Sequence, residues 1–185
     1  MTHRIPASTE SSVARYFYDC EFIEDGVTID LVSIAVIAED GREFYAVSTE
    51  FDQARAGDWV RRNVLDKLPP PSSTVWRSRR QIREGLAAFL LAPGLPVELW
   101  AWFAAYDHVA LAQLWGAMPA LPKRIPRLTR EIRQYWEAAG SPPLPQHTTD
   151  RHNALADARL ALARWQVADR VLMSNERHAL PTLEQ

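Results

Sequence analysis

The segment YFYDCEF, residues 16–22, places two carboxylates, Asp19 and Glu21, inside a run of aromatic residues that favours a buried β-strand. Side chains alternate between the two faces of a strand, so we expect both acids on one face and Cys20 on the other. Like charges this close raise a pKa unless a cation lies between them, and carboxylate oxygens suit Mg²⁺ or Mn²⁺. Taken alone, the pair favours a simpler interpretation, a strand end whose acids reach solvent or pair with arginines.

The composition limits the classes of protein that the chain can belong to. Its 185 residues, 47% of them hydrophobic, suit one domain with its own core. A formal net charge of −2 argues against a protein that binds long duplex nucleic acid through its overall charge. It does not exclude a substrate whose phosphates contact local arginines and metal ions. The single cysteine, Cys20, excludes an internal disulfide and a cysteine zinc site, and fits a reducing compartment. The chain has neither an apolar stretch of roughly 18 residues nor the apolar centre of a signal peptide, so we expect a cytoplasmic protein without membrane contact.

The order of hydrophobic patterns predicts a single α/β domain, with a mixed β-sheet flanked by helices. Strands are expected at residues 13–22, at two places within 24–48 joined by a turn at 39–41, and at 96–103. Helices are expected at residues 51–68, 77–92, 106–116, 129–140 and 152–173. The domain itself is expected at residues 15–173, between a mobile N-terminal tail at 1–14 and a C-terminal tail at 174–185.

A third acid, Asp107, follows the strand at 96–103 and lies at the start of a helix. An aspartate is favourable there simply as a cap or as a negative charge near a helix N-terminus. A functional role requires that Asp107 meet Asp19 and Glu21 in space, which adjacent strand ends would permit.

The segment HNALADAR adds His152 and Asp157. Five residues turn an α-helix by roughly 140°, so the two side chains would not share a face if both were helical. We therefore expect His152 on the loop that enters the last helix and Asp157 on the helix, facing the sheet. Alternatively, Asp157 pairs with Arg159 or Arg164, and His152 is an ordinary loop histidine.

Together, Asp-x-Glu in the first strand, an aspartate opening a middle helix and His-x4-Asp near the last helix resemble the DEDDh 3'-5' exonuclease superfamily. The segments RYFYDCEFIEDG, ELWAWFAAYDHVALAQLWG and HNALADAR are most similar to the polyadenylate-specific 3'-5' exoribonucleases of actinobacterial type. The similarity covers roughly residues 15–165. It implies a ribonuclease H-like fold, single-stranded RNA or an RNA 3' overhang as substrate, AMP as the product from poly(A), and a homodimer.

The resemblance also implies roles for the five residues. Asp19, Glu21 and Asp157 would hold one Mg²⁺, with Mn²⁺ as a possible substitute. Asp19 would hold a second ion together with Asp107, directly or through water, and two ions ~4 Å apart clamp the attacking and leaving oxygens of an in-line displacement. His152 would be the general base, since its ordinary pKa suits proton transfer at neutral pH. If it is not, His108 and His147 are the other candidates.

Substrate contacts are expected from Glu21, Phe22 and Trp102. Phe22 directly follows Glu21, where related exonucleases wedge a residue against the terminal base, although Phe22 could equally belong to the core. Trp102 begins WFAAYD, where many superfamily members have Asn-x-x-Phe/Tyr-Asp and this chain has no asparagine. Trp102 could line the site in its place, or pack in the core. Basic residues near Tyr135 and Trp136 could follow the phosphate backbone: Lys123, Arg124, Arg127, Arg130 and Arg133.

Two other functions remain open at this stage. One is a DNA exonuclease or short-oligonucleotide trimmer with the same site. The other is a non-catalytic RNA-binding scaffold of the same fold, although all five expected functional residues are present. A preference for adenine follows from the resemblance alone, because no side chain can be assigned to a base edge from the sequence.

Overall fold

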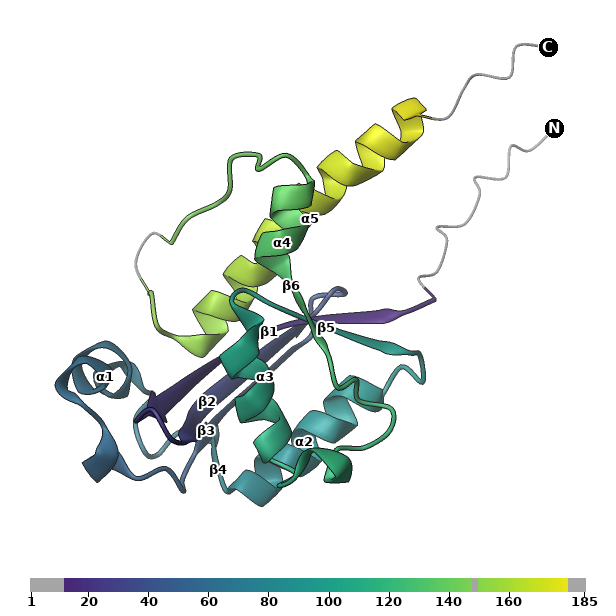
Figure 1. Cartoon of the computed structure of the whole chain (residues 1–185). Coiled ribbons are helices and arrows are strands. Elements are labelled where there is room, and N and C mark those ends of the chain that lie inside the picture. The colour runs from purple at the N-terminus through teal and green to yellow at the C-terminus, as the bar shows by residue number, and fades with distance from the viewer. Residues whose placement is uncertain (1–11, 148–149, 180–185) are drawn as a thin grey trace, which may run out of the picture.

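A computed structural model describes residues 12–147 and 150–179 of the chain. In this part of the chain a six-stranded sheet has the order β4-β3-β2-β1-β5-β6, with helices on both sides (Figure 1). The strands are β1 (Ala14–Glu24), β2 (Ile29–Ala38), β3 (Glu43–Ser48), β4 (Trp76–Arg77), β5 (Val97–Ala101) and β6 (Thr129–Glu131). The helices are α1 (Asp58–Asn63), α2 (Arg79–Leu91), α3 (Ala104–Gln113), α4 (Ile132–Ala138) and α5 (Ala154–Ala179). The expected single domain with a mixed sheet and flanking helices is confirmed.

Strand β1 lies at the centre of the sheet. It pairs antiparallel with β2 and, over residues 14–17 only, parallel with β5. Asp19 is opposite Ala35 and Glu21 is opposite Ser33, and the register shifts between Glu21 and Phe22. Because the pairing with β5 ends at Phe17, the edge of β1 that faces β5 has no described strand as its partner at Asp19 and Glu21. The half of β1 that contains Asp19 and Glu21 is thus the half that β5 does not cover.

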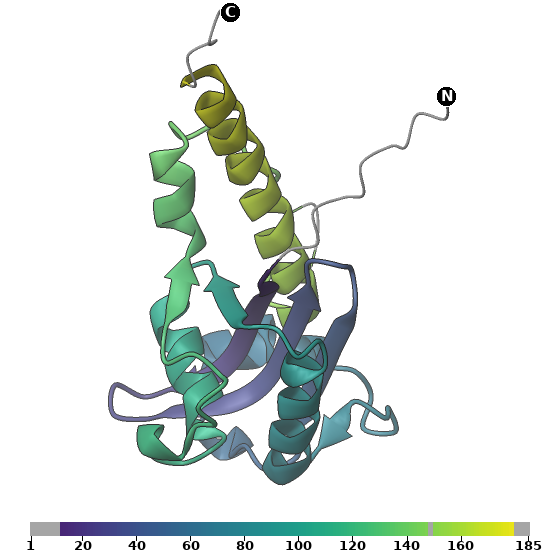
Figure 2. The ribbon, with the colours of Figure 1, turned by 90° about the vertical axis from the view of Figure 1, so that its right-hand side faces the viewer.

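Alternation along β1 divides its residues between two layers. Tyr16, Tyr18 and Cys20 are buried in the large core formed with α2 and α3. Phe17 is buried on the opposite face, where Trp165 of α5 packs against it with ring centroids 5.0 Å apart. Figure 2 shows α5 beside α4, both rising past the end of the sheet. Asp19 and Glu21 belong to the Phe17 series, so the pattern directs them toward the first turns of α5.

The segment at residues 51–68 differs from the single helix that the sequence predicts. It forms α1 between two 3-10 turns, Gln53–Arg55 and Leu65–Lys67. Gly57 has an extended backbone at the start of α1, which interrupts the helix. Ala56 and Val64 can then both pack against the end of β1 and β2, beside Ile23 and Val32.

Other element boundaries also differ. Residues 129–131 form β6 and only the following residues are helical, while β4 has no counterpart among the expected strands. Helix α5 continues to Ala179, beyond the end predicted at Met173. Residues 1–11 of the expected N-terminal tail lie outside the described part of the chain. Among the described residues, no helix combines the length and the apolar character that crossing a bilayer requires.

Candidate active site

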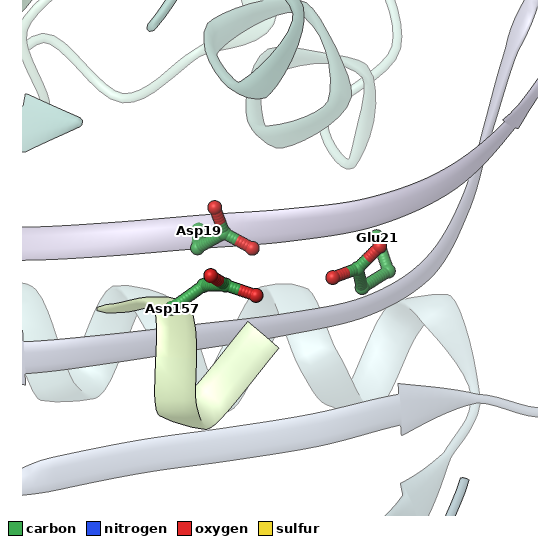
Figure 3. Close-up of side chains that lie close together, drawn as sticks. All are labelled: Asp19, Glu21 and Asp157. Carbon is green, nitrogen blue, oxygen red and sulfur yellow. The ribbon is translucent and has the colours of Figure 1, made fainter. Parts of the chain in front are cut away.

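Three carboxylates converge beside β1. Asp19 and Glu21 extend from the strand toward Asp157 in the first turn of α5, as Figure 3 shows. One oxygen of each lies within 4.8 Å of the others. Carboxylate oxygens at this spacing could share a divalent cation.

The start of α5 fixes the position of Asp157. The side-chain oxygen of Asn153 accepts hydrogen bonds from the backbone N–H groups of Leu155 and Ala156, each at 3.1 Å, which caps the helix. In return, the N–H of Asn153 donates to one oxygen of Asp157 at 3.1 Å. The other oxygen of Asp157 contacts Nε2 of His147. Each oxygen of the Asp157 carboxylate therefore has a partner that fixes its position, and the carboxylate faces Asp19 and Glu21 of β1.

Two carboxylates of the cluster, those of Asp19 and Glu21, have raised pKa values, which a bound cation would lower. Burial, followed by repulsion from the neighbouring carboxylates, raises the pKa of Asp19 well above its usual range. The same causes, partly offset by Lys67, raise the pKa of Glu21 to about 8. Groups that would be ionised in water are thus forced toward their protonated forms, and a divalent ion would reverse this shift. The donor set fits the metal that the sequence predicts.

Asp107 adds a fourth carboxylate where β5 has ended. Its Oδ1 accepts a hydrogen bond of 2.8 Å from the backbone N–H of Cys20, which is free to bond outward because β5 no longer pairs with β1 at this point. Asp107 is only 6% exposed. Burial raises its pKa to about 7, although the hydrogen bond from Cys20 opposes the shift. Asp107 thus reaches β1 at the residue between Asp19 and Glu21, but it is not one of the three carboxylates whose oxygens lie within 4.8 Å of one another.

A cavity of about 450 Å³ encloses the cluster. It brings together the residues to which the sequence assigns metal binding, base catalysis or contact with the terminal nucleotide: Asp19, Glu21, Phe22, Trp102, Asp107, His152 and Asp157. The alternative base His108 and the five basic residues suggested for the phosphate backbone are not among the residues that line it. Its wall also includes Trp59, Phe103, His147, Arg151 and Arg164. Acids, two histidines and aromatic rings therefore surround one space large enough for a nucleotide-sized ligand.

Two histidines line this cavity in different ways. His152 precedes α5 in a left-handed conformation, with φ of 61°, and its ring meets that of Trp59. Burial lowers the pKa of His152, and the nearby Asp157 opposes that shift. The shift favours the uncharged imidazole, which is the form able to accept a proton. His147 instead bonds to Asp157, and His108 bonds through Nδ1 to Thr129 at 2.9 Å on the α3 side.

Comparison with known proteins identifies the family. Residues 14–168 match the model of the 3'-5' exoribonuclease Rv2179c-like domain. The chain belongs to this exoribonuclease family. The 3'-5' exoribonuclease Rv2179c of Mycobacterium tuberculosis strain H37Rv is 63% identical over 154 residues, which are 83% of this chain and 92% of the relative. The 3'-5' exoribonuclease MT2234.1 of strain CDC 1551 matches with the same figures. The expected enzyme class, a 3'-5' exoribonuclease, is confirmed.

Solved nuclease structures share the fold at low sequence identity. Pop2p of S. pombe, in a form with Mg²⁺ and Mn²⁺ bound, has a TM-score of 0.51 at 12% identity, covering 84% of this chain and 83% of that one. The Pan2 catalytic unit of Neurospora crassa has a TM-score of 0.52 at 13% identity, and the match covers 94% of this chain but 30% of that one. These likenesses confirm the expected ribonuclease H-like fold.

The cavity wall of this exoribonuclease includes side chains that the sequence does not predict, among them Trp59, Phe103 and Arg164. Trp59 lies in the segment predicted as one continuous helix, so its direction could not be placed. Phe103 is part of WFAAYD, where the sequence predicts a site role only for its neighbour Trp102. Trp102 does line the cavity, with the guanidinium of Arg164 over its ring at 4.5 Å. For Arg164 the sequence suggests only an ion pair with Asp157.

Proposed function

We propose that this exoribonuclease uses divalent metal ions to hydrolyse single-stranded RNA, or RNA 3' overhangs, to nucleoside 5'-monophosphates. Family membership supports the polarity and the nature of the substrate. The observation that carries the metal dependence is the cluster of Asp19, Glu21 and Asp157, whose oxygens lie within 4.8 Å of one another.

The acids would hold two Mg²⁺ ions, or Mn²⁺ in their place. Asp19, Glu21 and Asp157 would hold one, and Asp19 would hold the other together with Asp107, directly or through water. Bound ions supply charge neutralisation at the scissile phosphate and a lowered pKa for the attacking water. Support for this assignment comes from the raised pKa values of Asp19, Glu21 and Asp107, since a cation relieves the repulsion that contributes to them.

His152 is the general base of the proposal. Its ring lines the cavity and its lowered pKa favours the uncharged form, whose unprotonated nitrogen accepts a proton from the attacking water. His152 lies on the loop before α5 and Asp157 lies in its first turn, so both side chains can reach the cavity although they would not share one face of a helix.

Glu21, Phe22 and Trp102 contact the terminal nucleotide in this proposal. Phe22 stacks on Tyr106, with ring centroids 5.8 Å apart and planes at 11°, which fixes its orientation at the cavity wall.

A preference for poly(A), with AMP as product, is part of the proposal and rests on the similarity of sequence. The same similarity supports a homodimer, and the single cysteine is compatible with a location in the cytoplasm.

A degradation assay tests the proposal. Oligoadenylate labelled at its 5' end is incubated with the protein in Mg²⁺ and then in chelator, next to the other three ribonucleotide homopolymers and a matched DNA oligomer. We expect a ladder that shortens from the 3' end in Mg²⁺, with no ladder in chelator or for Asp157→Asn. Equal cleavage of DNA would support the DNA exonuclease instead, because the 2'-hydroxyl would have no role. RNA binding without cleavage under any metal condition would support the scaffold.

A further inference from the structure

The backbone of Phe103 adopts a conformation that a bulky residue rarely takes. It has φ of 61° and ψ of 48°, the left-handed region, directly before α3. The carboxylate of Glu131 accepts hydrogen bonds from the N–H groups of Phe103, at 3.0 Å, and Ala104, at 2.8 Å. This double contact stabilises the unfavourable geometry. Backbone strain that the surroundings maintain in this way is concentrated at functional sites.

The strained backbone directs an aromatic ring into solvent at the edge of the catalytic cavity. Phe103 lines the cavity, yet it is 59% exposed. A phenyl ring gains little by facing water, so packing within the folded chain does not explain this orientation. The exposure is explained if a ligand covers the ring.

Other aromatic residues of the cavity are already engaged. Trp102 is covered by Arg164 and lies 6.1 Å from the ring of Trp136, measured between centroids. Phe22 stacks on Tyr106, and Trp59 meets His152. Phe103 makes an edge contact with Trp102, with ring planes at 73°, and is the most exposed of these cavity aromatics.

A cation accompanies the exposed ring. The guanidinium of Arg133 lies over Phe103 at 5.4 Å from the ring centroid. Its Nε forms an ion pair of 3.1 Å with Glu137, and both side chains are about half exposed. A guanidinium has four further N–H donors, which suit two oxygens of a phosphate. An aromatic ring next to an exposed arginine is the combination by which proteins bind single-stranded nucleic acid.

We infer that Phe103 stacks on a base of the single-stranded RNA, upstream of the 3'-terminal nucleotide, and that Arg133 binds the adjoining phosphate. The upstream position follows from the place of Phe103 at the rim, outside the carboxylate cluster. The inference rests on the proposed function, because it requires that the cavity receive the 3' end of an RNA.

The test compares a substrate that has upstream bases with one that has none. Phe103→Ala and Phe103→Trp are assayed on oligoadenylate and on the 4-nitrophenyl ester of adenosine 5'-monophosphate, which has the same terminal nucleotide. We expect Phe103→Ala to raise KM for oligoadenylate about tenfold and to leave kcat within about twofold, since base stacking contributes mainly to binding. Phe103→Trp should keep the wild-type KM, and neither variant should change hydrolysis of the ester. Leu128→Ala removes another exposed apolar side chain, 64% exposed and outside the cavity wall, and should change nothing.

A series of oligoadenylates, each with one abasic ribonucleotide, locates the stacked base. One abasic position upstream of the 3' terminus should raise KM for the wild type as much as Phe103→Ala does, and should have no further effect on that variant. An unchanged KM for Phe103→Ala, an equal loss on the ester, or an abasic effect at the terminal nucleotide alone overturns the inference.

If the wild-type protein cuts neither substrate, the proposed function is overturned. That outcome does not by itself decide whether Phe103 stacks on a base. Binding of fluorescein-labelled oligoadenylate then still decides the role of Phe103. Anisotropy measured in the Asp157→Asn background should show about tenfold weaker binding when Phe103→Ala is added. Equal binding by the two proteins would contradict stacking.

Discussion

The imidazole of His152 meets the indole of Trp59 at an angle of 78°, with the two ring centroids 4.7 Å apart. The contact joins α1 to the loop before α5, and the ammonium group of Lys67 reinforces it by donating to the carbonyl of Arg151 at 2.5 Å. On the other side of His152, the cap formed by Asn153 fixes the chain. The ring of the proposed base is therefore oriented by a residue that lies far away in the sequence.

Trp59→Ala should lower kcat on the order of tenfold with little change in KM, because a proton acceptor that is free to rotate spends less time in the productive geometry. Trp59→Phe keeps a ring against His152 and should restore most of the rate. A double-mutant cycle with His152→Ala separates this role from RNA binding, which the 53% exposure of Trp59 would also allow. If Trp59 acts through His152, the double variant is as slow as His152→Ala alone. Effects that multiply would show that Trp59 acts on the substrate directly.

His152→Ala should reduce kcat by about 10²–10⁴-fold, the usual contribution of a general base, and leave metal affinity nearly unchanged. His147→Ala is the matched control, because His147 lines the same cavity and contacts Asp157. Its loss should cost less than His152→Ala, since Asn153 still holds the other oxygen of Asp157. Single-turnover rates and Mg²⁺ titrations of both variants make the comparison. A near-normal rate for His152→Ala would move the base to His147 or His108.

The metal-free protein should lose stability as pH rises from about 6.5 to about 8. Glu21 and Asp107 have folded-state pKa values raised to about 8 and about 7, above their unfolded values. The folded protein therefore binds more protons than the unfolded chain in this window, so its stability is greatest at lower pH and falls through the folded pKa values. The lowered pKa values of His108 and His152 act in the opposite direction below about pH 6.5.

Thermal unfolding in chelator and in Mg²⁺ measures this effect. Mg²⁺ should raise Tm more at the upper end of the window than at the lower end, because the metal competes with protons for the same carboxylates. Glu21→Gln removes one titrating group and should flatten the curve in chelator. A Tm in chelator that is independent of pH across the window would mean that the acids are not forced together in the folded state.

Asp107→Asn should abolish most activity and leave the fold intact. The amide oxygen of asparagine can still accept the N–H of Cys20, which Asp107 now accepts at 2.8 Å, so the edge of β1 stays capped. The negative charge is lost, and with it one proposed metal contact. We expect Tm in chelator above neutral pH to be equal to or higher than that of the wild type, because one buried carboxylate has been removed. A large drop in Tm together with the drop in activity would assign Asp107 to structure instead.

Some parts of this site follow from local rules that a sequence contains. The period of two along a strand is enough to place Asp19 and Glu21 on one face, and the helical turn separates His152 from Asp157. The structure agrees, with Asp157 in the first turn of α5 and His152 on the loop before it.

The remaining parts depend on contacts between distant segments. Strands β4 and β6 contain two and three residues, too few to produce a periodic pattern. Trp59 reaches the cavity only because α1 is a short helix between two turns, and this interruption depends on burial of Ala56 and Val64 against β1 and β2. Such tertiary packing overrides local helix propensity and cannot be read from one segment alone.

Phe103→Asn should make the protein more stable and less able to bind RNA. Asparagine tolerates the left-handed region much better than phenylalanine does, and little apolar burial is lost because Phe103 is 59% exposed. Relief of the backbone strain should be worth about 1 kcal/mol, which corresponds to a rise in Tm of roughly 2–4 °C for a chain of this length. KM for oligoadenylate should rise at the same time, as for Phe103→Ala. Phe103→Ala is the matched control for stability, since alanine does not share the tolerance of asparagine for positive φ and should bring no gain in Tm. A lower Tm for Phe103→Asn would show that the ring stabilises the fold, and the argument that strain is kept for substrate binding would fail.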